Sequence, residues 1–131
     1  MKHATMRVLL LVLAVFALGR TLAAEGDDWP RRPIKLIVPN AAGSSNDTLS
    51  RILAQQLGQE LGQNIVVEND AGAAGLVGME MGKNAAPDGY TLIAGSPSAT
   101  TIAANLRKNL PYDPLNDFEY ISTYAVLPNL L

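Results

Sequence analysis

The chain has 131 residues, no cysteine and a formal charge of −2, a length that suits one domain and is short for two. Its single histidine is His3, so the chain beyond the first segment contains neither His nor Cys. This composition excludes disulfides, the usual zinc sites and every nucleophile that depends on Cys or on a His base, and we expect no metal and no cofactor.

Residues 1–24 have the pattern of a cleavable secretory signal peptide. Lys2 and Arg7 precede an apolar core of about eleven residues, and the small residues that end at Ala24 suit a signal peptidase. The apolar core is too short for a membrane anchor, because a helix needs roughly 20 residues to cross a bilayer. The pattern therefore predicts cleavage after Ala24, or as the second choice after Ala23, and a periplasmic protein.

The part that follows the predicted signal peptide carries seven basic and twelve acidic residues, a formal charge of −5. Nucleic acid is a poor partner for such a chain, because binding to phosphates usually depends on a surplus of Lys and Arg. We therefore expect no nucleic-acid binding.

The first structural unit is a strand, a loop of small residues and a helix. Residues 34–38 form an apolar run that predicts a buried strand, and Pro39 ends it. Gly43 permits backbone angles that other residues avoid. Three polar residues can cap the helix that follows, namely Ser45, Asn46 and Asp47. The first N–H groups of a helix are unpaired and carry about half a positive charge, so this loop predicts a site for a carboxylate or phosphate.

The first helix is predicted from apolar residues that recur along one face. These are Leu49, Ile52, Leu53, Leu57 and Leu61. Gly62 is expected to end the helix, because glycine readily adopts the left-handed conformation that follows a last helical turn.

The second unit repeats the order of the first. Residues 65–68, of which the first three are β-branched, predict a strand, and residues 69–75 form another loop of small residues. A weaker helical pattern then passes through Val77, Met81 and Ala85.

The third unit begins after a turn at residues 87–89, where Pro and Gly supply the required backbone angles. Residues 90–94 predict a strand and residues 95–100 its exit loop. A short helix is then indicated by Ile102, Ala103 and Leu106. From residue 109 on, prolines mark a crossover, and residues 120–127 predict the start of another strand.

This alternation predicts an α/β fold of the order βαβαβα, with a parallel, doubly wound sheet that has helices on both faces. The loops that begin at Pro39, Asn69 and Gly95 would all emerge at the carboxyl edge of that sheet. Three helix N-termini can then converge on one crevice, and we expect a small anionic molecule as its occupant.

Several polar side chains near these loops have alternative roles. Asp47 is either a base or metal ligand, or a cap or brace of the first loop, and the second role is favoured because no His or second carboxylate lies at useful spacing. Glu68 is interpreted as a strand-end residue that braces the second loop. Arg51 and the pair Arg31–Arg32 are interpreted as surface charges. Two roles are equally open for Ser96, Ser98 and Thr100: they either donate hydroxyl hydrogen bonds to a ligand or cap a helix.

A series of short motifs runs through residues 29–131. The main ones are Trp29-Pro30-x-Arg32-Pro33-Ile34, Ala42-Gly43-x-Ser45-Asn46-Asp47 with Arg51, Val67-Glu68-Asn69, Ala86-Pro87-Asp88-Gly89-Tyr90, and Leu110-Pro111-Tyr112-Asp113-Pro114. In this combination and order, the chain resembles the Bug-type periplasmic solute receptors of tripartite tricarboxylate transporters. The resemblance implies a two-lobed, type 2-like periplasmic binding protein that delivers a small carboxylate or related metabolite to a membrane permease. It implies no catalysis.

The resemblance also implies how the chain is divided. Residues 25–108 correspond to the N-terminal part of the first α/β lobe, and residues 109–131 to a crossover and the start of the second lobe, so the fold is truncated. The implied ligand contacts come from the three loops, and they are Asn40, Ala42, Gly43, Ser45, Asn46, Asp47, Ala73, Gly75, Ser96, Ser98 and Thr100.

The sequence departs from the family pattern in the first loop, which leaves the ligand open. Asn40 stands where an aromatic residue is usual, and Ser44 stands where a second glycine is usual. A truncated remnant that binds nothing is one alternative. An exported hydrolase with Ser44 or Ser45 as nucleophile is another, disfavoured because the G-x-S-x-G pattern and a His base are absent.

We predict that the mature chain begins at Glu25 and lies outside the cytoplasm, because the charged start, the apolar core and the Ala pair together form a processing signal. N-terminal sequencing of the periplasmic fraction checks this expectation. An intact Met1 on membrane-bound protein would contradict it.

Overall fold

The computed structural model describes residues 29–126, so the predicted signal peptide lies outside the described residues. The elements follow the predicted order of strand and helix, three times over. They are β1 (Ile34–Val38), α2 (Ser45–Leu61), β2 (Ile65–Asn69), α3 (Gly72–Lys83), β3 (Thr91–Ile93), the π-helical turn η1 (Ser98–Ile102) and α4 (Ala103–Leu106). Within the described part of the chain, no helix has the length and apolar character needed to cross a membrane.

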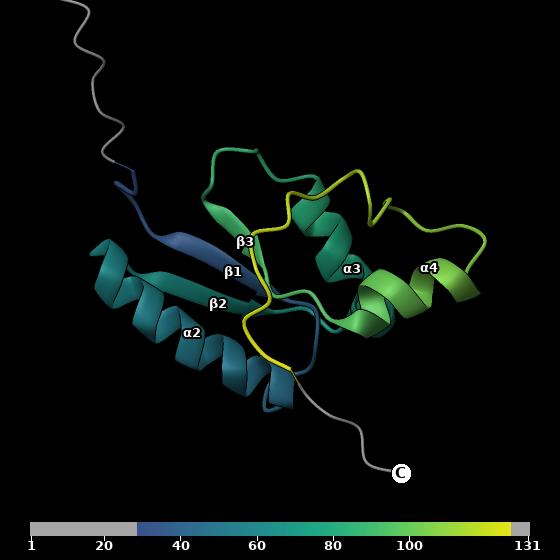
Figure 1. Ribbon diagram of the computed structural model, residues 1–131, viewed down its shortest axis with the longest axis horizontal. Helices are drawn as coiled ribbons and strands as arrows, with labels where there is room; N and C mark the ends of the chain where they lie inside the picture. Colours follow the sequence, from purple (N-terminus) through teal and green to yellow (C-terminus); the bar gives the residue numbers. More distant parts are fainter. Residues whose placement is uncertain (1–28, 127–131) are drawn as a thin grey trace, which may run out of the picture.

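The strands form one parallel sheet in the order β2-β1-β3, which confirms the predicted topology (Figure 1). Strand β1 lies in the centre, where Ile34 pairs with Ile65 of β2 and Leu36 pairs with Leu92 of β3. Its apolar side chains are almost fully buried, as expected for a parallel strand that is covered on both faces.

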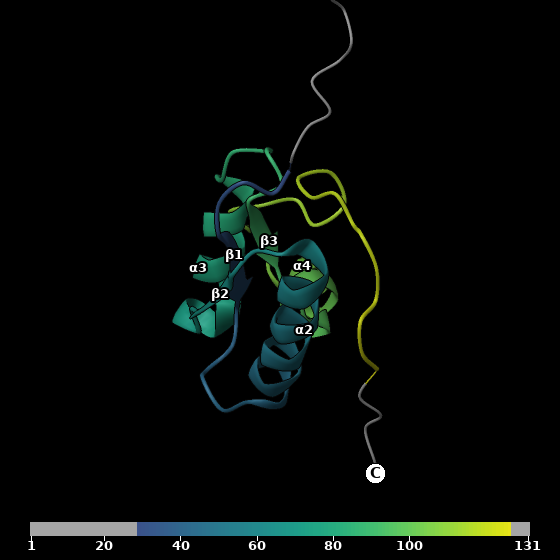
Figure 2. The ribbon, with the colours of Figure 1, turned by 90° about the vertical axis from the view of Figure 1, so that its left-hand side faces the viewer.

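The helices cover both faces of the sheet, as a doubly wound fold requires. Figures 1 and 2 show α2 on one side of the strands and α3 on the other. Alternate β1 residues, Ile34, Leu36 and Val38, pack with Ala54 of α2 in one apolar cluster. A second cluster on the α3 side has its buried members on α3, η1, α4 and the chain beyond them, namely Leu76, Met79, Ala99, Ala103 and Tyr112.

The buried face of α2 differs from the predicted one. Ile52 was expected on the apolar face but is 55% exposed, whereas Ser50 is fully buried and Ala54 nearly so. The helix lies against the sheet through these small residues, which allow a close approach, and Leu57 and Leu61 fill the edge of the same cluster. Gly62 ends the helix in the left-handed conformation, as predicted.

The predicted faces of the later helices were also wrong. Val77 is 40% and Met81 37% exposed, and α3 buries Leu76, Gly78 and Met79 instead. A Cβ atom at Gly78 would lie 3.2 Å from the Pro39 side chain, so this helix approaches β1 through its glycine side. The short helix near residue 102 consists of η1 and α4, and of its three predicted apolar residues only Ala103 is buried.

The crossover after residue 107 packs on α3. The ammonium of Lys83 lies 2.9 Å from a carboxylate oxygen of Asp117 and donates to the Pro111 carbonyl at 3.1 Å. Tyr112 is buried, and its hydroxyl donates to the Ala99 carbonyl. The strand predicted over residues 120–127 does not form within residues 120–126, because no described strand lies beside this segment to pair with it.

The second loop is held against β1 by Gly75. Its φ of 89° lies in the left-handed region, and a Cβ atom at this position would be 2.3 Å from the Pro39 carbonyl oxygen. Ala73 and Ala74 precede it with φ values of 50° and 63°. This conformation costs a residue with a side chain about 1–2 kcal/mol, so the contacts of the loop must offset strain at both alanines.

We predict that Gly75→Ala destabilises the fold by about 1–3 kcal/mol more than Gly43→Ala. Both glycines have a positive φ, but a Cβ atom at Gly43 would meet nothing within 4 Å, so the difference isolates the collision with Pro39. Urea unfolding of the two variants measures it. Equal losses of unfolding free energy would show that the Pro39 contact is unimportant.

Candidate ligand-binding site

The three predicted loops lie at the carboxyl edge of the sheet. We call residues 39–44 the first loop, residues 70–75 the second loop and residues 94–100 the third loop. The second loop overlaps the start of α3, where residues 73–75 have non-helical backbone angles, and the third loop includes the first residues of η1. Each is tied to the end of β1: the Asp70 amide donates to the Val38 carbonyl at 2.9 Å, and the Ala94 amide donates to the Ile37 carbonyl at 2.8 Å. The predicted meeting of the loops at one edge is therefore confirmed.

The first loop passes into α2 through a cap at Ser44. This residue has extended backbone angles, and its hydroxyl accepts from the Asp47 amide at 3.2 Å. The caps expected at Ser45, Asn46 or Asp47 were wrong by at least one position, because these residues already belong to the helix. Ser44, which stands where the family usually has glycine, therefore caps α2, a role that the sequence did not indicate.

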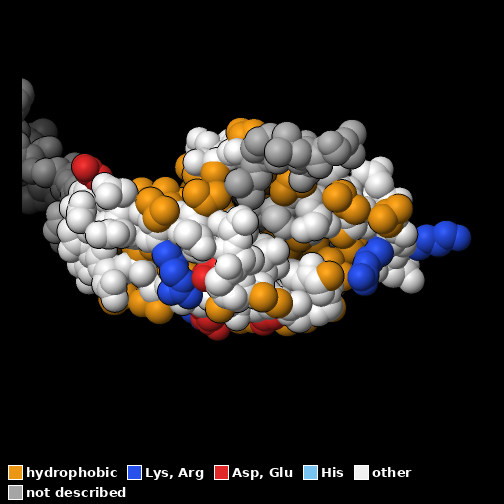
Figure 3. Space-filling view, turned by 90° about the horizontal axis from the view of Figure 1, so that it is seen from below, with side chains coloured by type: hydrophobic (Ala, Val, Ile, Leu, Met, Phe, Trp, Pro, Cys, Tyr) orange, Lys and Arg blue, Asp and Glu red, His pale blue; other side chains and the backbone are white. Residues whose placement is uncertain are grey.

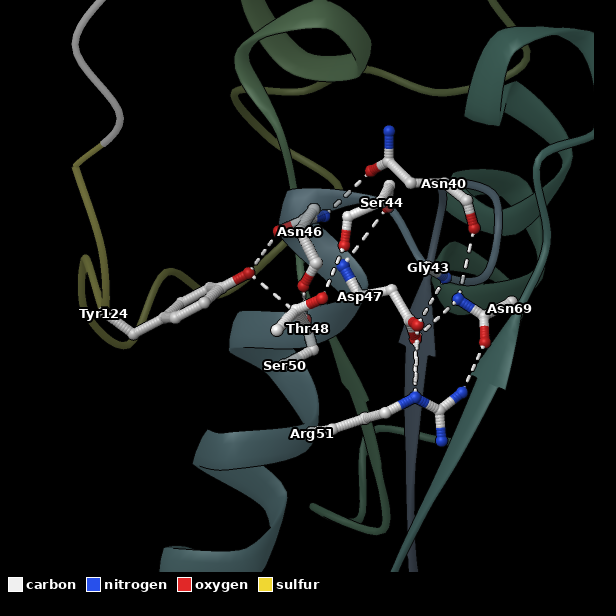
Figure 4. A network of polar contacts seen from close by, with 10 residues as sticks. All are labelled: Asn40, Gly43, Ser44, Asn46, Asp47, Thr48, Ser50, Arg51, Asn69 and Tyr124. Atoms are coloured by element: carbon white, nitrogen blue, oxygen red, sulfur yellow. Dashed lines mark hydrogen bonds and ion pairs between the residues drawn. The ribbon is translucent and has the colours of Figure 1, made fainter.

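Asp47 is the buried centre of this end of the molecule, with 3% of its surface exposed (Figure 4). Its carboxylate accepts from the Gly43 amide at 2.8 Å and from the Asn69 side-chain amide at 2.9 Å, and it pairs with Arg51 at 3.0 Å. The Gly43 amide, then Arg51 and Asn69, lower the Asp47 pKa from 3.8 to about 2. Among the described residues no cluster of acids could hold a metal, and Asp47 acts as the predicted brace.

Two residues at the end of β2 and in α2 complete this brace. Asn69 donates to the Asn40 carbonyl at 3.2 Å as well as to Asp47, and Arg51 donates to the Asn69 side-chain oxygen at 2.9 Å. Arg51 is half exposed, but its guanidinium is held by Asp47 and Asn69 and so is more than the surface charge we expected. Asn69 was missed as a site residue, although it stands in one of the quoted motifs.

The predicted role of Glu68 was wrong. Its carboxylate lies 2.6 Å from the ammonium of Lys35 on the neighbouring strand, and it makes no bond to the second loop. Successive side chains of a strand point to opposite faces, so the adjacent Asn69 reaches the first loop and Glu68 does not. Arg32 pairs with Asp88 at 2.9 Å and lies over the Tyr90 ring at the opposite end of the sheet, as expected for a surface charge.

Asn46 joins three separate segments through its side chain (Figure 4). Its amide nitrogen donates to the Asn40 side-chain oxygen at 2.8 Å and to the Ala94 carbonyl at 3.0 Å. Its amide oxygen accepts from the hydroxyl of Tyr124, which lies 78 residues further along the chain. No pattern in the sequence marked Tyr124 as a member of the site.

Some backbone amides of this region are occupied and others are not. Those of Gly43, Ser44, Asp47 and Thr48 donate to groups within the first loop and the start of α2. Within residues 29–126, the amides of Ala42, Ser45 and Asn46 have no partner. Unpaired amides at the start of a helix form a place where an anion is favoured.

The second and third loops contribute mainly shape and hydroxyl groups. Gly75 is buried and Ala73 is exposed. The Ser96 and Ser98 hydroxyl oxygens lie 2.8 Å apart, and the Thr100 hydroxyl donates to the Ser96 carbonyl at 3.0 Å. None of the three hydroxyls caps η1 or α4, so of the two roles left open by the sequence the helix cap is excluded.

The face of the molecule over α2 has few charges. Figure 3, seen from below the view of Figure 1, shows a few Lys and Arg side chains that lie apart from one another, one group of them beside acidic side chains. Basic side chains therefore form no continuous patch on this face. An anion at the start of α2 would be held mainly by backbone N–H groups.

Comparison with known proteins places these observations in a family. Residues 49–131 match the sequence model described as the tripartite tricarboxylate transporter family receptor. Protein BugT of Bordetella pertussis (strain Tohama I / ATCC BAA-589 / NCTC 13251) is 39% identical over 126 residues, which are 94% of this chain and 39% of BugT. The chain therefore spans well under half the length of such a relative.

Two solved structures are similar in both fold and sequence. The periplasmic binding protein BugD is 39% identical with a TM-score of 0.63, over 70% of this chain and 30% of BugD. MatC from Rhodopseudomonas palustris, solved with bound malate, is 38% identical with a TM-score of 0.66, over 69% of this chain and 31% of MatC.

The lowered pKa of Asp47 predicts how stability depends on pH. Because the folded-state pKa of about 2 lies below the ordinary value of 3.8, the stabilisation by this carboxylate is full above about pH 4 and is lost as the pH falls toward 2. We expect Asp47→Asn to have a lower Tm than the wild type at pH 7 and a flatter decline of Tm between pH 4 and pH 2.

Thermal unfolding followed by circular dichroism at pH 7, 4, 3 and 2 makes this comparison. Some decline remains in Asp47→Asn, because hydrogen bonds also lower the pKa of Asp113 and Asp117. Glu60→Gln, at an exposed position of the same helix, is the matched control and should keep the wild-type decline. An Asp47→Asn profile parallel to that of the wild type would exclude the brace as an acid-sensitive element.

Proposed function

Because this chain belongs to the tripartite tricarboxylate transporter receptor family, we propose that it is part of an extracytoplasmic receptor that captures a small carboxylate and delivers it to a membrane permease. Residues 25–108 supply the N-terminal part of the first lobe, and residues 109–131 lead toward the second. The chain thus provides one wall of a binding cleft.

The observation that carries the proposal is the set of unpaired amides of Ala42, Ser45 and Asn46 at the start of α2. The helix dipole adds about half a positive charge at this place, and the guanidinium of Arg51, in the second turn of α2, is already paired with Asp47. Such a site favours a carboxylate over a neutral molecule. The malate bound to the similar protein MatC is a ligand of this class.

The remaining predicted site residues have different roles in this proposal. Asn40, Gly43 and Asp47 hold the first loop in shape through hydrogen bonds inside the protein. Ala73 and Gly75 shape the second loop beside it. The third loop offers hydroxyl groups to a second polar group of the ligand, from Ser96, Ser98 and Thr100.

The family and the pattern of residues 1–24 support a proposed location and a proposed partner. The pattern of residues 1–24 supports export to the periplasm, where BugD is described as a binding protein. A membrane permease is the partner that the family description implies. The related proteins are solute-binding proteins, and the proposal includes no catalytic step.

A non-binding remnant is the second candidate. The chain spans 30% of BugD and 31% of MatC, so in an experiment on this chain alone a ligand on this wall is in contact with water. Water weakens charge-assisted hydrogen bonds, and binding to one wall is expected to be weak. A method that detects weak binding is therefore needed to separate the two candidates.

We predict that malate shifts the backbone resonances of Ala42, Ser45 and Asn46 in a ¹⁵N NMR titration of the chain, and that neutral malamide does not. The carboxylate accepts from these amides, whereas the diamide brings no charge to the helix start. The amide of Gly43, which already donates to Asp47, should shift less. Identical small shifts with malate and malamide would favour the remnant.

A further inference from the structure

Tyr124 makes a long-range contact that the proposed function does not use. Its hydroxyl donates to the side-chain oxygen of Asn46 and lies 3.3 Å from the hydroxyl of Ser50, which is fully buried (Figure 4). Ser50 in turn donates to the Asn46 carbonyl at 2.6 Å. The tyrosine therefore contacts Asn46 directly and also through the next turn of α2.

This contact is one of three that together fix the orientation of the Asn46 side chain. The amide nitrogen has two donor hydrogens, and they are used by the Asn40 side chain and by the Ala94 carbonyl. The Tyr124 hydroxyl occupies the amide oxygen. Each of the three bonds goes to a different segment. Both amide hydrogens and the amide oxygen of Asn46 therefore have a partner, and the orientation of the side chain is fixed.

The segment that carries Tyr124 has few other attachments. Residues 121–123 and Val126 are exposed, and among residues 119–126 the only side-chain hydrogen bonds are those of Tyr120 and Tyr124. Tyr120 donates to the Pro114 carbonyl and so binds within the crossover itself. Tyr124 alone among these described residues joins the segment to the start of α2, where Figure 1 shows it passing in yellow.

From these contacts we propose that Tyr124 is a positioning residue of the carboxylate site, a role that rests on the function proposed above. It holds the Asn46 side chain, and through it the first turn of α2, so that the amides of Ser45 and Asn46 stay directed outward and unpaired. Tyr124 itself does not contact the ligand.

The test compares Tyr124→Phe with Tyr120→Phe in the full chain. Both variants remove one hydroxyl from the same segment and keep the ring, but only the first removes a bond to Asn46. Without ligand, Tyr124→Phe should shift the side-chain NH₂ resonances of Asn46 and the backbone amides of Ser45 and Asn46. With malate as the probe, its dissociation constant should rise by about three- to tenfold, the usual effect of one lost hydrogen bond. Tyr120→Phe should change neither.

The thermal midpoint separates positioning from general stability. A positioning role requires that the melting temperatures of the two variants differ by no more than a few degrees, because each variant loses a single hydroxyl group from a partly exposed side chain, although the Tyr124 hydroxyl also lies 3.3 Å from that of Ser50. Unchanged Asn46 resonances in Tyr124→Phe would overturn the proposal. So would a weakened malate affinity of equal size in both variants, because that result would indicate loosening of the segment as a whole.

The outcome for malate also keeps the two proposals apart. If the wild type shows no malate-specific shift, the proposed receptor function fails, and the ligand-free resonances of Asn46 still decide whether Tyr124 positions it. If the wild type binds malate and Tyr124→Phe binds it equally well, the receptor function stands and the positioning role is wrong.

Discussion

The buried carboxylate of Asp47 is the interaction on which this end of the protein depends. It joins three parts of the chain that are distant in sequence or different in structure: the first loop through Gly43, the helix α2 through Arg51, and the end of β2 through Asn69. A buried carboxylate is costly unless it is paired and hydrogen-bonded, and here each of its oxygens has partners. The positions of the first loop and of the start of α2 therefore follow from satisfying one charge.

This arrangement is consistent with the proposal that a chain with a net negative charge binds an anion. The nearest cation, Arg51, is neutralised by the protein's own carboxylate, and Asp47 takes up the Gly43 amide as well. What remains for a ligand is a small set of backbone N–H groups with the dipole of α2 behind them. Recognition by such groups depends on their direction more than on charge, so the contacts that hold the loop matter as much as the groups that touch the ligand.

Close backbone packing places the second loop beside the first. Gly75 and Gly78 let the start of α3 approach Pro39, and the alanines before them adopt a left-handed turn that a longer, less confined loop would avoid. The two loops are thus joined by contact at Pro39 on one side and by hydrogen bonds of Asn69 on the other. The shape of this edge of the sheet thus depends on glycine packing, and the placement of its polar groups depends on hydrogen bonds. The sequence alone did not mark the residues that make either kind of contact.

Local sequence patterns determined much of this structure. The apolar runs, the glycine after α2, the alternation of strands and helices and the series of motifs indicated a parallel doubly wound sheet, three loops at one edge and the receptor family. Each of these depends on residues that are neighbours in sequence, or on spacing within one element, so a linear reading can find them. The role of Asp47 as a brace could also be predicted from the sequence. No His or second carboxylate lies at a useful spacing from it, so a catalytic or metal-binding role was disfavoured.

Tertiary contacts alone decided the helix faces and the partners of the site. Ile52, Val77 and Met81 had suitable spacing but remained exposed, because α2 and α3 approach the sheet through their small residues, which periodicity of apolar residues does not reveal. Asn69 reaches Asp47 across 22 residues, and Tyr124 reaches Asn46 across 78. A hydrogen bond between such distant residues depends on how the elements are packed, and nothing in the local sequence around either partner encodes it.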